Sequence, residues 1–463
     1  MGVRGPYLRR SVYGVPGSEE TPTITPYPWP ATGHGVPPGP AGKVLLILEN
    51  EPACLSHRVT KQVDTLVQAG YGVGVITRRH PGNQSFLSRP GVRVLDYRPP
   101  RDAEHPLGYL IEYGYSFLAA AFLTFRAMLA GGVDVVQFCQ PPDVYFPLAW
   151  VLRRLGVKIL VDQRDLLPEL YAARFGRVPP LVLAALRLSE RLGFKTADRI
   201  VCTNGYQCDR ALAASKLPDD HVALVRNGPV LTHVAAARSD DALKRGRTYL
   251  CCWLGAIGRQ DRVDLLLHSI QQVIFDLGRK DTEFAIIGPG ECLEDMRELA
   301  RRLGLGDWVH FPGYLPPERL FRYLATADLG LDTSLQSDVS PVKLYEYMAF
   351  GLPVVAFDLR ETRLLADGAA DLTEPGDIAA HARAVDALLA SPGRRRKLGQ
   401  AGQERVRAEL AWDHQARVYA GVIGQLAGAA PRPDPGAGDL GEGDPGTGLA
   451  VATAHDHARG GRE

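Results

Sequence analysis

Short apolar runs alternate with amphipathic stretches over most of the chain between residues 42 and 427. The run VLLIL after Lys43 predicts a buried strand, residues 57–68 predict a helix, and VGVIT after Gly72 predicts the next strand. This β-α-β succession is typical of a parallel sheet with right-handed crossovers. The first half of the chain therefore predicts an α/β domain.

The alternation continues along the first half, stops once, and then starts again. Further strands of the first half are predicted at 133–138, 158–162, 199–202 and 222–225. The polar and Ala-rich residues 231–247 then break the pattern. After the break, strands are predicted at 249–255, 283–288, 309–311 and 329–332. We expect two doubly wound, Rossmann-like domains that face each other across a cleft, with ligands bound beyond the carboxyl ends of the strands.

The most informative pattern lies in the stretch DVSPVKLYEYMAFGLPVV, which begins at Asp338. Ser340 suits the N-cap of a helix, Pro341 suits the first helical position, and Gly351 ends the helix. The free N–H groups and the dipole of a helix N-terminus attract phosphate. The stretch therefore predicts an anion site at the start of this helix.

Two carboxylates flank the predicted helix start, because Asp338 stands eight positions before Glu346, with Lys343 between them. Carboxylates beside a phosphate are unfavourable unless they accept hydrogen bonds from other groups, such as sugar hydroxyls. A nucleotide sugar brings a diphosphate, a ribose and a hexose together. The pattern favours a nucleotide-sugar site, although a solvated loop Asp and an ordinary helix Glu would show the same spacing.

The same stretch resembles the E-x7-E motif of glycosyltransferase family 4, with Asp338 in place of the first Glu. The resemblance covers residues 43–425 and is strongest in the second half, where AIIGPGECLEDMRELARRLGLGDWVHFPGYLPPERL resembles a conserved block of the family. It implies the GT-B fold and transfer of a sugar from a nucleotide-sugar donor, with a UDP-sugar expected. It also implies retention of the anomeric configuration.

The resemblance further implies roles for single residues. Asp338 would contact the donor hexose and Glu346 would hold the ribose. The helix start would bind the diphosphate, a glycine would let the donor approach, and backbone groups of a loop would bind the base. The residues implied at the diphosphate are Ser340, Val342 and Lys343. The glycine is Gly288, and the loop that binds the base is the one that contains Tyr314 and Leu315.

The second domain departs from the family pattern at the diphosphate. Many family members carry an Arg and a Lys after the first strand of this domain, and both neutralise the leaving group. Here Arg259 is close to the Arg position, and Asp261 stands at the Lys position. The adjacent Arg262 could substitute, because a guanidinium pairs well with phosphate oxygens. We expect Asp338, Arg259 and Lys343 to be the catalytic residues.

The first domain departs from the pattern as well. A His common in the family is replaced by Arg164, which could orient a hydroxyl of the donor or acceptor, or form a structural ion pair with Asp162 or Asp165. Acceptor or phosphate contacts are expected at Asn50, Glu51 and Arg58, although a solvated loop and helix start would look the same.

These expectations divide the chain into successive parts. They are a disordered tail (1–41), an acceptor domain (42–230), a linker (231–247), a nucleotide-sugar donor domain (248–410), a helix crossing back to the first domain (411–427) and a disordered tail (428–463). The crossing of the last helix is implied by the GT-B resemblance, although a plain C-terminal helix with Trp412 in its core would fit the sequence equally. Because the leaving phosphate oxygen could take the acceptor proton, no protein base is required. No D-x-D motif lies at a suitable strand end, so we expect no essential metal and no cofactor besides the nucleotide-sugar co-substrate.

Composition narrows the cellular context. The formal net charge of +1 gives no general field for polyanions, which argues against nucleic acid as a partner. The seven cysteines are scattered and form no C-x-x-C pair, which suggests a reducing cytoplasm and no structural zinc. No apolar segment is long enough to span a bilayer, and the nearest, residues 117–125, is too short.

The acceptor is not named by the sequence. The segment LVLAALRLSERLGFK, residues 181–195, places basic residues at four-residue spacing beside an apolar face. It could lie on an anionic membrane surface at the inner face of the membrane, or it could be an ordinary packing helix. A lipid-linked glycan of envelope polysaccharide assembly is the first expectation for the acceptor, and a soluble small molecule is the second.

Three functions other than sugar transfer are alternative hypotheses for this sequence. A nucleotide-sugar epimerase of the same fold would need acid and base residues in the cleft, where few His or Glu residues are available. A degenerate homologue would bind a nucleotide sugar or a partner without turnover, which the missing Lys and His would allow. A nicotinamide dehydrogenase is poorly supported, because neither domain begins with G-x-G-x-x-G.

Overall fold

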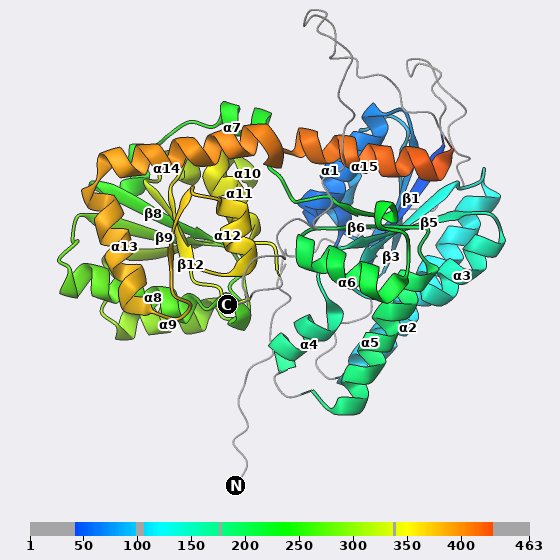
Figure 1. The fold of residues 1–463 in the computed structure, drawn as a ribbon, viewed down its shortest axis with the longest axis horizontal. Helices are drawn as coiled ribbons and strands as arrows, with labels where there is room; N and C mark the ends of the chain where they lie inside the picture. The colour runs from blue at the N-terminus through cyan, green and yellow to red at the C-terminus, as the bar shows by residue number, and fades with distance from the viewer. Residues whose placement is uncertain (1–41, 99–105, 176–177, 337–338, 429–463) are drawn as a thin grey trace, which may run out of the picture. The chain divides into compact units, whose positions relative to one another are not determined.

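The computed structural model describes residues 42–98, 106–175, 178–336 and 339–428 (Figure 1). The predicted tail 1–41 lies outside the described residues, and so does the predicted tail 428–463 apart from Gly428, which ends the last helix. The first domain is built on seven parallel strands in the order β3-β2-β1-β4-β5-β6-β7. Their bounds are β1 Lys43–Leu48, β2 Gly72–Arg78, β3 Val92–Tyr97, β4 Val135–Gln140, β5 Lys158–Gln163, β6 Arg199–Cys202 and β7 Val222–Leu224. The sequence did not predict β3.

Alternate residues of β1 bury their side chains on opposite faces of this sheet. Leu46 belongs to the core beneath α1 (His57–Gln68) and α15 (Trp412–Ala427), whereas Ile47 belongs to the core beneath α2 (Pro106–Leu129) and α3 (Phe146–Arg154). The helices α5 and α6 continue the second layer, since Phe194 and Ala211 pack with Val161 and Cys202 on that side. The helix bounds are α1 His57–Gln68, α2 Pro106–Leu129, α3 Phe146–Arg154, α4 Leu167–Phe175, α5 Pro180–Thr196 and α6 Gly205–Ser215.

The second domain has six parallel strands in the order β10-β9-β8-β11-β12-β13. Its strands are β8 Tyr249–Leu254, β9 Thr282–Ile287, β10 Val309–Gly313, β11 Leu329–Asp332, β12 Val354–Phe357 and β13 Ala370–Thr373. Helices again cover both faces. They are α8 Val263–Gln271, α9 Leu293–Arg302, α10 Pro317–Thr326, α11 Val342–Ala349, α12 Arg360–Ala366, α13 Ile378–Ala390 and α14 Pro392–Arg405. The α/β architecture with two Rossmann-like sheets is therefore as predicted.

Residues 231–247, expected as a linker, contain the short helix α7 (Leu231–Ala236) and a 3-10 turn at Asp241–Lys244. Leu231, Val234 and Leu243 pack against the core of the second domain. This segment is therefore held against one domain by its apolar side chains.

The end of the described chain changes domain within two residues. Leu410 and Ala411 are buried in the core of the second domain, whereas Trp412 is buried in the core of the first. From there α15 (Trp412–Ala427) lies beside α1 (Figure 1), and the Trp412 indole donates a hydrogen bond to Thr65 Oγ1 at 3.0 Å. The last helix thereby completes the fold of the first domain.

Candidate functional site

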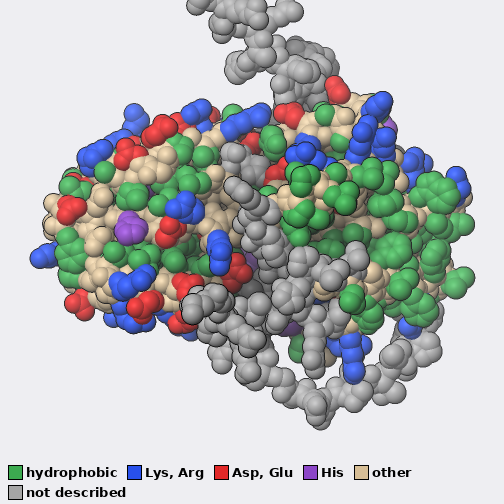
Figure 2. Space-filling model, turned by 90° about the horizontal axis from the view of Figure 1, so that it is seen from below, with side chains coloured by type: hydrophobic (Ala, Val, Ile, Leu, Met, Phe, Trp, Pro, Cys, Tyr) green, Lys and Arg blue, Asp and Glu red, His purple; other side chains and the backbone are tan. Residues whose placement is uncertain are grey.

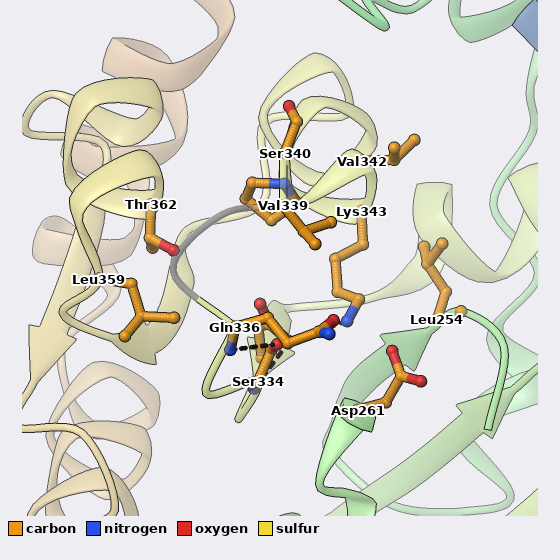
Figure 3. Close-up of a pocket in the computed structure, with 13 residues that line it drawn as sticks. Leu254, Asp261, Ser334, Gln336, Val339, Ser340, Val342, Lys343, Leu359 and Thr362 are labelled. Atoms are coloured by element: carbon orange, nitrogen blue, oxygen red, sulfur yellow. Dashed lines mark hydrogen bonds and ion pairs between the residues drawn. The ribbon is translucent and has the colours of Figure 1, made fainter. Parts of the chain in front are cut away.

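A cavity of about 280 Å³ lies in the second domain at the carboxyl ends of β8 and β11. In the sheet, β9 lies on one side of β8 and β11 on the other, so these two strand ends mark the topological switch point. Open α/β sheets bind ligands at this point. Figure 3 shows its side chains, and the lining residues are Leu254, Gly255, Asp261, Asp332, Ser334, Gln336, Val339, Ser340, Pro341, Val342, Lys343, Leu359 and Thr362.

Helix α11 begins in the wall of this cavity. Pro341 precedes its first residue, Val342, and no side chain among the described residues caps the helix. Ser340 was predicted as the N-cap, but its hydroxyl instead shares a hydrogen bond with the hydroxyl of Tyr345 at 3.1 Å. The helix therefore starts one position later than predicted, and its first N–H groups are not taken by a described side chain.

Lys343 is buried at the centre of the cavity wall, with 8% of its surface exposed. Its ammonium donates to Asp332 Oδ1 at 2.8 Å and lies 4.6 Å from the centroid of the Trp253 ring. Asp332 is the last residue of β11, and Trp253 belongs to β8. The positive charge is thus fixed by two neighbouring strands at the switch point.

Asp261 is the second carboxylate of the cavity. Its Oδ2 accepts a hydrogen bond from the N–H of Gly258 at 3.2 Å. Burial raises the pKa of Asp261 above its usual value, and Asp332 raises it further, although Lys343 and the Gly258 N–H act in the opposite direction. Among the lining residues that the structure describes, two carboxyl groups and one ammonium therefore share the cavity, and protonation of Asp261 would leave this set close to neutral.

The residues predicted around the E-x7-E motif are only partly brought together. Ser340, Val342 and Lys343 line the cavity. Glu346 lies one turn further along α11, is partly buried, and has its pKa raised by burial. Asp338 lies outside the described residues.

The two predicted arginines do not line the cavity. Arg259 is exposed on the turn Arg259–Asp261. Arg262 has a positive φ of 52° and forms a two-armed ion pair with Asp264, with both N–O distances at 2.9 Å. The guanidinium of Arg262 is therefore engaged by its neighbour on the chain.

Gly288 and the predicted base-binding residues also lie outside the cavity wall. A Cβ at Gly288 would come within 1.8 Å of the carbonyl oxygen of Gly255, and the φ of Gly288 is 143°. The neighbouring backbone thus explains why this position is a glycine. Tyr314 and Leu315 follow β10, where Tyr314 is 59% exposed and Leu315 is buried in the core.

In the first domain, Arg58 forms a buried ion pair with Asp162. Its Nη2 lies 2.7 Å from Asp162 Oδ1, and its Nη1 donates to the carbonyl of Val225 and to Asn227 Oδ1. Burial alone would raise the pKa of Asp162, but Arg58 and Arg164 lower it below its usual value. Arg58 is therefore positioned as a structural cation, whereas its expected contact was with the acceptor or a phosphate.

Arg164 lies against the same carboxylate, with its Nε 3.3 Å from Asp162 Oδ2. Its Nη1 lies 3.2 Å from Ser56 Oγ and 3.5 Å from Glu51 Oε1. Asn50, also predicted here, is exposed in the loop after β1. The ion-pair alternative for Arg164 is thus realised, and the group joins the end of β5 to the start of α1.

Sequence reasoning missed the role of Asp332 and the lining contributions of Gln336 and Thr362. The end of a predicted strand was the available signal for Asp332. Among the residues that the structure describes, no group of three or more His, Cys, Asp or Glu side chains is arranged to hold a metal ion.

Two family models match the chain, one on each domain. The model described as "Glycosyl transferase 4-like domain" matches residues 55–228, and the model described as "Glycosyl transferases group 1" matches residues 248–391. The chain belongs to the group 1 glycosyltransferases. The resemblance noted in the sequence and the GT-B fold that it implies are therefore confirmed.

Among curated relatives, the D-inositol 3-phosphate glycosyltransferase of Nocardia farcinica is 28% identical over 258 residues, which are 52% of this chain and 56% of that protein. The chain spans about half the length of the curated relatives it matches.

Two solved structures are similar to this chain in fold. Sucrose-phosphate synthase from Thermosynechococcus elongatus has a TM-score of 0.68 at 18% identity, covering 84% of this chain and 100% of that one. Anabaena HepE, solved in complex with UDP and glucose, has a TM-score of 0.65 at 14% identity, covering 83% of this chain and 100% of that one. At these identities the likeness concerns the fold.

Proposed function

We propose that this chain transfers a glycosyl group from a nucleotide sugar, with a UDP-sugar as the expected donor, to a hydroxyl of an acceptor. The observation that carries the proposal is the cavity at the switch point of the second domain, where the start of α11 and the ammonium of Lys343 meet. Helix N-termini and buried cations both favour a diphosphate.

The donor would be held along α11. The diphosphate would lie at the first turn, near Ser340, Val342 and Lys343. Glu346, one turn later, would accept hydrogen bonds from the ribose, and Asp338 would contact the hexose. These two assignments come from the family motif, and the spacing of the two acids along the chain supports them.

The remaining donor contacts are proposed from the loops around the same sheet edge. Tyr314 and Leu315 would bind the base through backbone groups. Gly288 would keep its loop close to the donor. Arg259 and Arg262 would help to neutralise the diphosphate, which for Arg262 requires release from Asp264.

In the proposed reaction the bond from the anomeric carbon to the diphosphate breaks, and a bond to the acceptor oxygen forms. The acceptor proton moves to the departing phosphate oxygen, so the step needs neither a protein base nor an essential metal. Retention follows if acceptor and leaving group share one face of the sugar. Positive groups fixed before the reaction stabilise the charge that develops on the diphosphate.

The acceptor is proposed as a glycan, a lipid-linked glycan or a small molecule, in the cytoplasm. Glu51, Arg58 and Arg164 meet at the carboxyl end of β5, the edge where this type of sheet binds ligands, and Asn50 lies in the loop after β1. Their ion pairs would keep this edge rigid. Peripheral contact with a membrane, expected from the helix at 181–195, would involve a larger surface of the first domain.

The test is calorimetric titration of the protein, without added metal, with UDP, GDP, ADP and their common sugar conjugates. The expected result is tight binding of one nucleotide, which Glu346→Gln weakens and Glu404→Gln leaves unchanged. Glu404 is a suitable control because it is exposed on α14 of the same domain. Absence of binding to every nucleotide would instead favour a degenerate homologue that binds a partner.

A further inference from the structure

The outer face of helix α2 carries a row of apolar side chains that are exposed to solvent. They recur at intervals of four and three residues along the helix and are 37% to 90% exposed. They are Ile111, Tyr115, Leu118, Phe122, Phe125 and Leu129. Together they form what we call the α2 stripe. A contiguous apolar surface of this kind on a folded protein marks an interaction site.

The α2 stripe continues onto two neighbouring helices. Phe117 of α2 stacks with Tyr145 at a centroid distance of 6.2 Å, directly before α3, and α3 packs against α5. The exposed apolar residues of these two helices are Trp150 and Val151 of α3 and Leu181 and Leu188 of α5. Figure 2 shows hydrophobic side chains gathered over a broad area on the side of the first domain.

The charged residues of the same three helices have one sign at the surface. The exposed cations are Arg126, Arg153, Arg154, Arg187, Arg191 and Lys195. The acids in the sequences of these helices are Glu112 and Glu190, which are 6% and 3% exposed and lie against Arg78 and Arg210. The face formed by α2, α3 and α5 is therefore apolar and basic, with no exposed carboxylate on these helices.

The apolar and basic character of this face distinguishes between two possible partners, a second copy of the chain and an anionic bilayer. A second copy of the chain, placed on the α2 stripe by a two-fold axis, would bring the same cations of both copies close together. An anionic bilayer instead offers negative headgroups beside an apolar interior, which fits both kinds of side chain at once.

Trp150 supports the same choice. The guanidinium of Arg154 lies 3.5 Å from the centroid of the Trp150 ring, so an aromatic side chain and a cation form one exposed unit. Trp residues and cations of this kind are enriched where membranes meet water.

We propose that the face formed by α2, α3 and α5 docks on an anionic lipid bilayer. The α2 stripe enters the boundary between headgroups and acyl chains, and the cations of α3 and α5 contact the phosphates. This interaction goes beyond sugar transfer and does not rest on it, because it uses no residue of the proposed donor site.

The experiment is sedimentation of the full chain with vesicles of phosphatidylcholine alone and of phosphatidylcholine mixed with phosphatidylglycerol. We expect binding to the mixed vesicles that weakens with added salt and is at least tenfold weaker with phosphatidylcholine alone. The double variants Leu118→Glu/Phe122→Glu and Arg187→Glu/Arg191→Glu should each lower the binding roughly tenfold or more. All four positions are exposed, so unfolding midpoints should not change.

Matched controls lie on the second domain. Leu364→Glu removes an apolar side chain that is 49% exposed, and Arg396→Glu/Lys397→Glu reverses two exposed cations of α14. Neither control should alter binding. The proposal is overturned if the mixed vesicles do not bind the protein, or if the α2 stripe variant binds them as well as the parent. It is also overturned if light scattering shows a dimer that Leu118→Glu/Phe122→Glu converts to a monomer.

Discussion

The ammonium of Lys343 and the carboxylate of Asp332 form a buried ion pair at 2.8 Å inside the cavity proposed for the donor diphosphate. The cation expected to meet the diphosphate is therefore already partnered before the donor arrives. A diphosphate in this cavity has to compete with Asp332 for the same ammonium.

Removing the competitor should strengthen nucleotide binding. Asp332→Asn keeps a hydrogen-bond acceptor for Lys343 but removes the negative charge, so UDP should bind several-fold more tightly. Lys343→Met should bind UDP roughly tenfold more weakly. Lys343→Met should also lower the stability by about 3 kcal/mol, because Asp332 is left buried without its partner. Calorimetry and urea unfolding measure the two effects, and unchanged UDP affinity in both variants would exclude this placement of the diphosphate.

Asp261 should make nucleotide binding depend on pH. Burial raises the pKa of Asp261, so its carboxyl is neutral at pH values below that pKa and negative at pH values above it. The negative form would repel the diphosphate. UDP affinity should therefore fall as the pH rises through the pKa of Asp261. Asp261→Asn keeps the acceptor for the Gly258 N–H and should remove this part of the pH dependence, which titrations at several pH values can separate from titration of UDP itself. If the UDP affinity instead rises as the pH rises through the pKa of Asp261, the carboxylate accepts a hydrogen bond from a sugar hydroxyl.

The Arg58–Asp162 pair should matter for stability. Arg58→Met leaves the Asp162 carboxylate buried with fewer partners, and we expect it to lower the free energy of unfolding by about 3 to 5 kcal/mol. Arg79→Met, at an ion pair with Asp96 whose side chains are 38% and 30% exposed, is the control and should cost less than about 1 kcal/mol. Denaturant unfolding compares the two variants. If both lower the free energy of unfolding equally, burial of the Arg58–Asp162 pair does not increase its contribution to stability.

His381 should make the fold sensitive to mild acid. Burial lowers the pKa of His381 to about 4, and its Nδ1 lies 2.8 Å from Ser269 Oγ. Between pH 6.5 and about 4 the unfolded chain therefore binds a proton that the folded chain does not, so stability falls as the pH falls through this window. The loss should reach on the order of 3 kcal/mol. Urea unfolding of His381→Gln at several pH values should show a shallower slope than the parent, and identical slopes would rule out this residue as the cause.

The alternation of strands and helices could be predicted because buried parallel strands form continuous apolar runs, as in LLIL of β1. The strand β3 could not be predicted in this way, because it lies at the edge of the sheet and pairs with β2 alone. Its residues Arg93 and Asp96 are only partly buried, so its sequence is not a continuous apolar run. The exposure of the α2 stripe could not be predicted either. That helix is apolar around most of its circumference, and only packing decides which side faces the sheet.

The candidate site was predictable where it depends on local sequence. The start of α11 follows from Pro341 and the residues after it, to within one position. The pairing of Lys343 with Asp332 had no local signal, because the loop between β11 and α11 brings the two together. Gly288 was predicted as a point of donor approach, while the structure adds the carbonyl of Gly255 as a reason for the missing side chain.

The change of domain between Ala411 and Trp412 has a consequence for synthesis on the ribosome. Trp412, Tyr419 and Ile423 are part of the first domain's core, and the Tyr419 hydroxyl bonds to Gln137 Oε1 at 2.6 Å. The domain that leaves the ribosome first therefore leaves the part of its core that α15 covers exposed until the second domain has been translated. This chain therefore cannot complete its first domain before its second domain has been synthesised, and the nascent first domain is open to aggregation during that time.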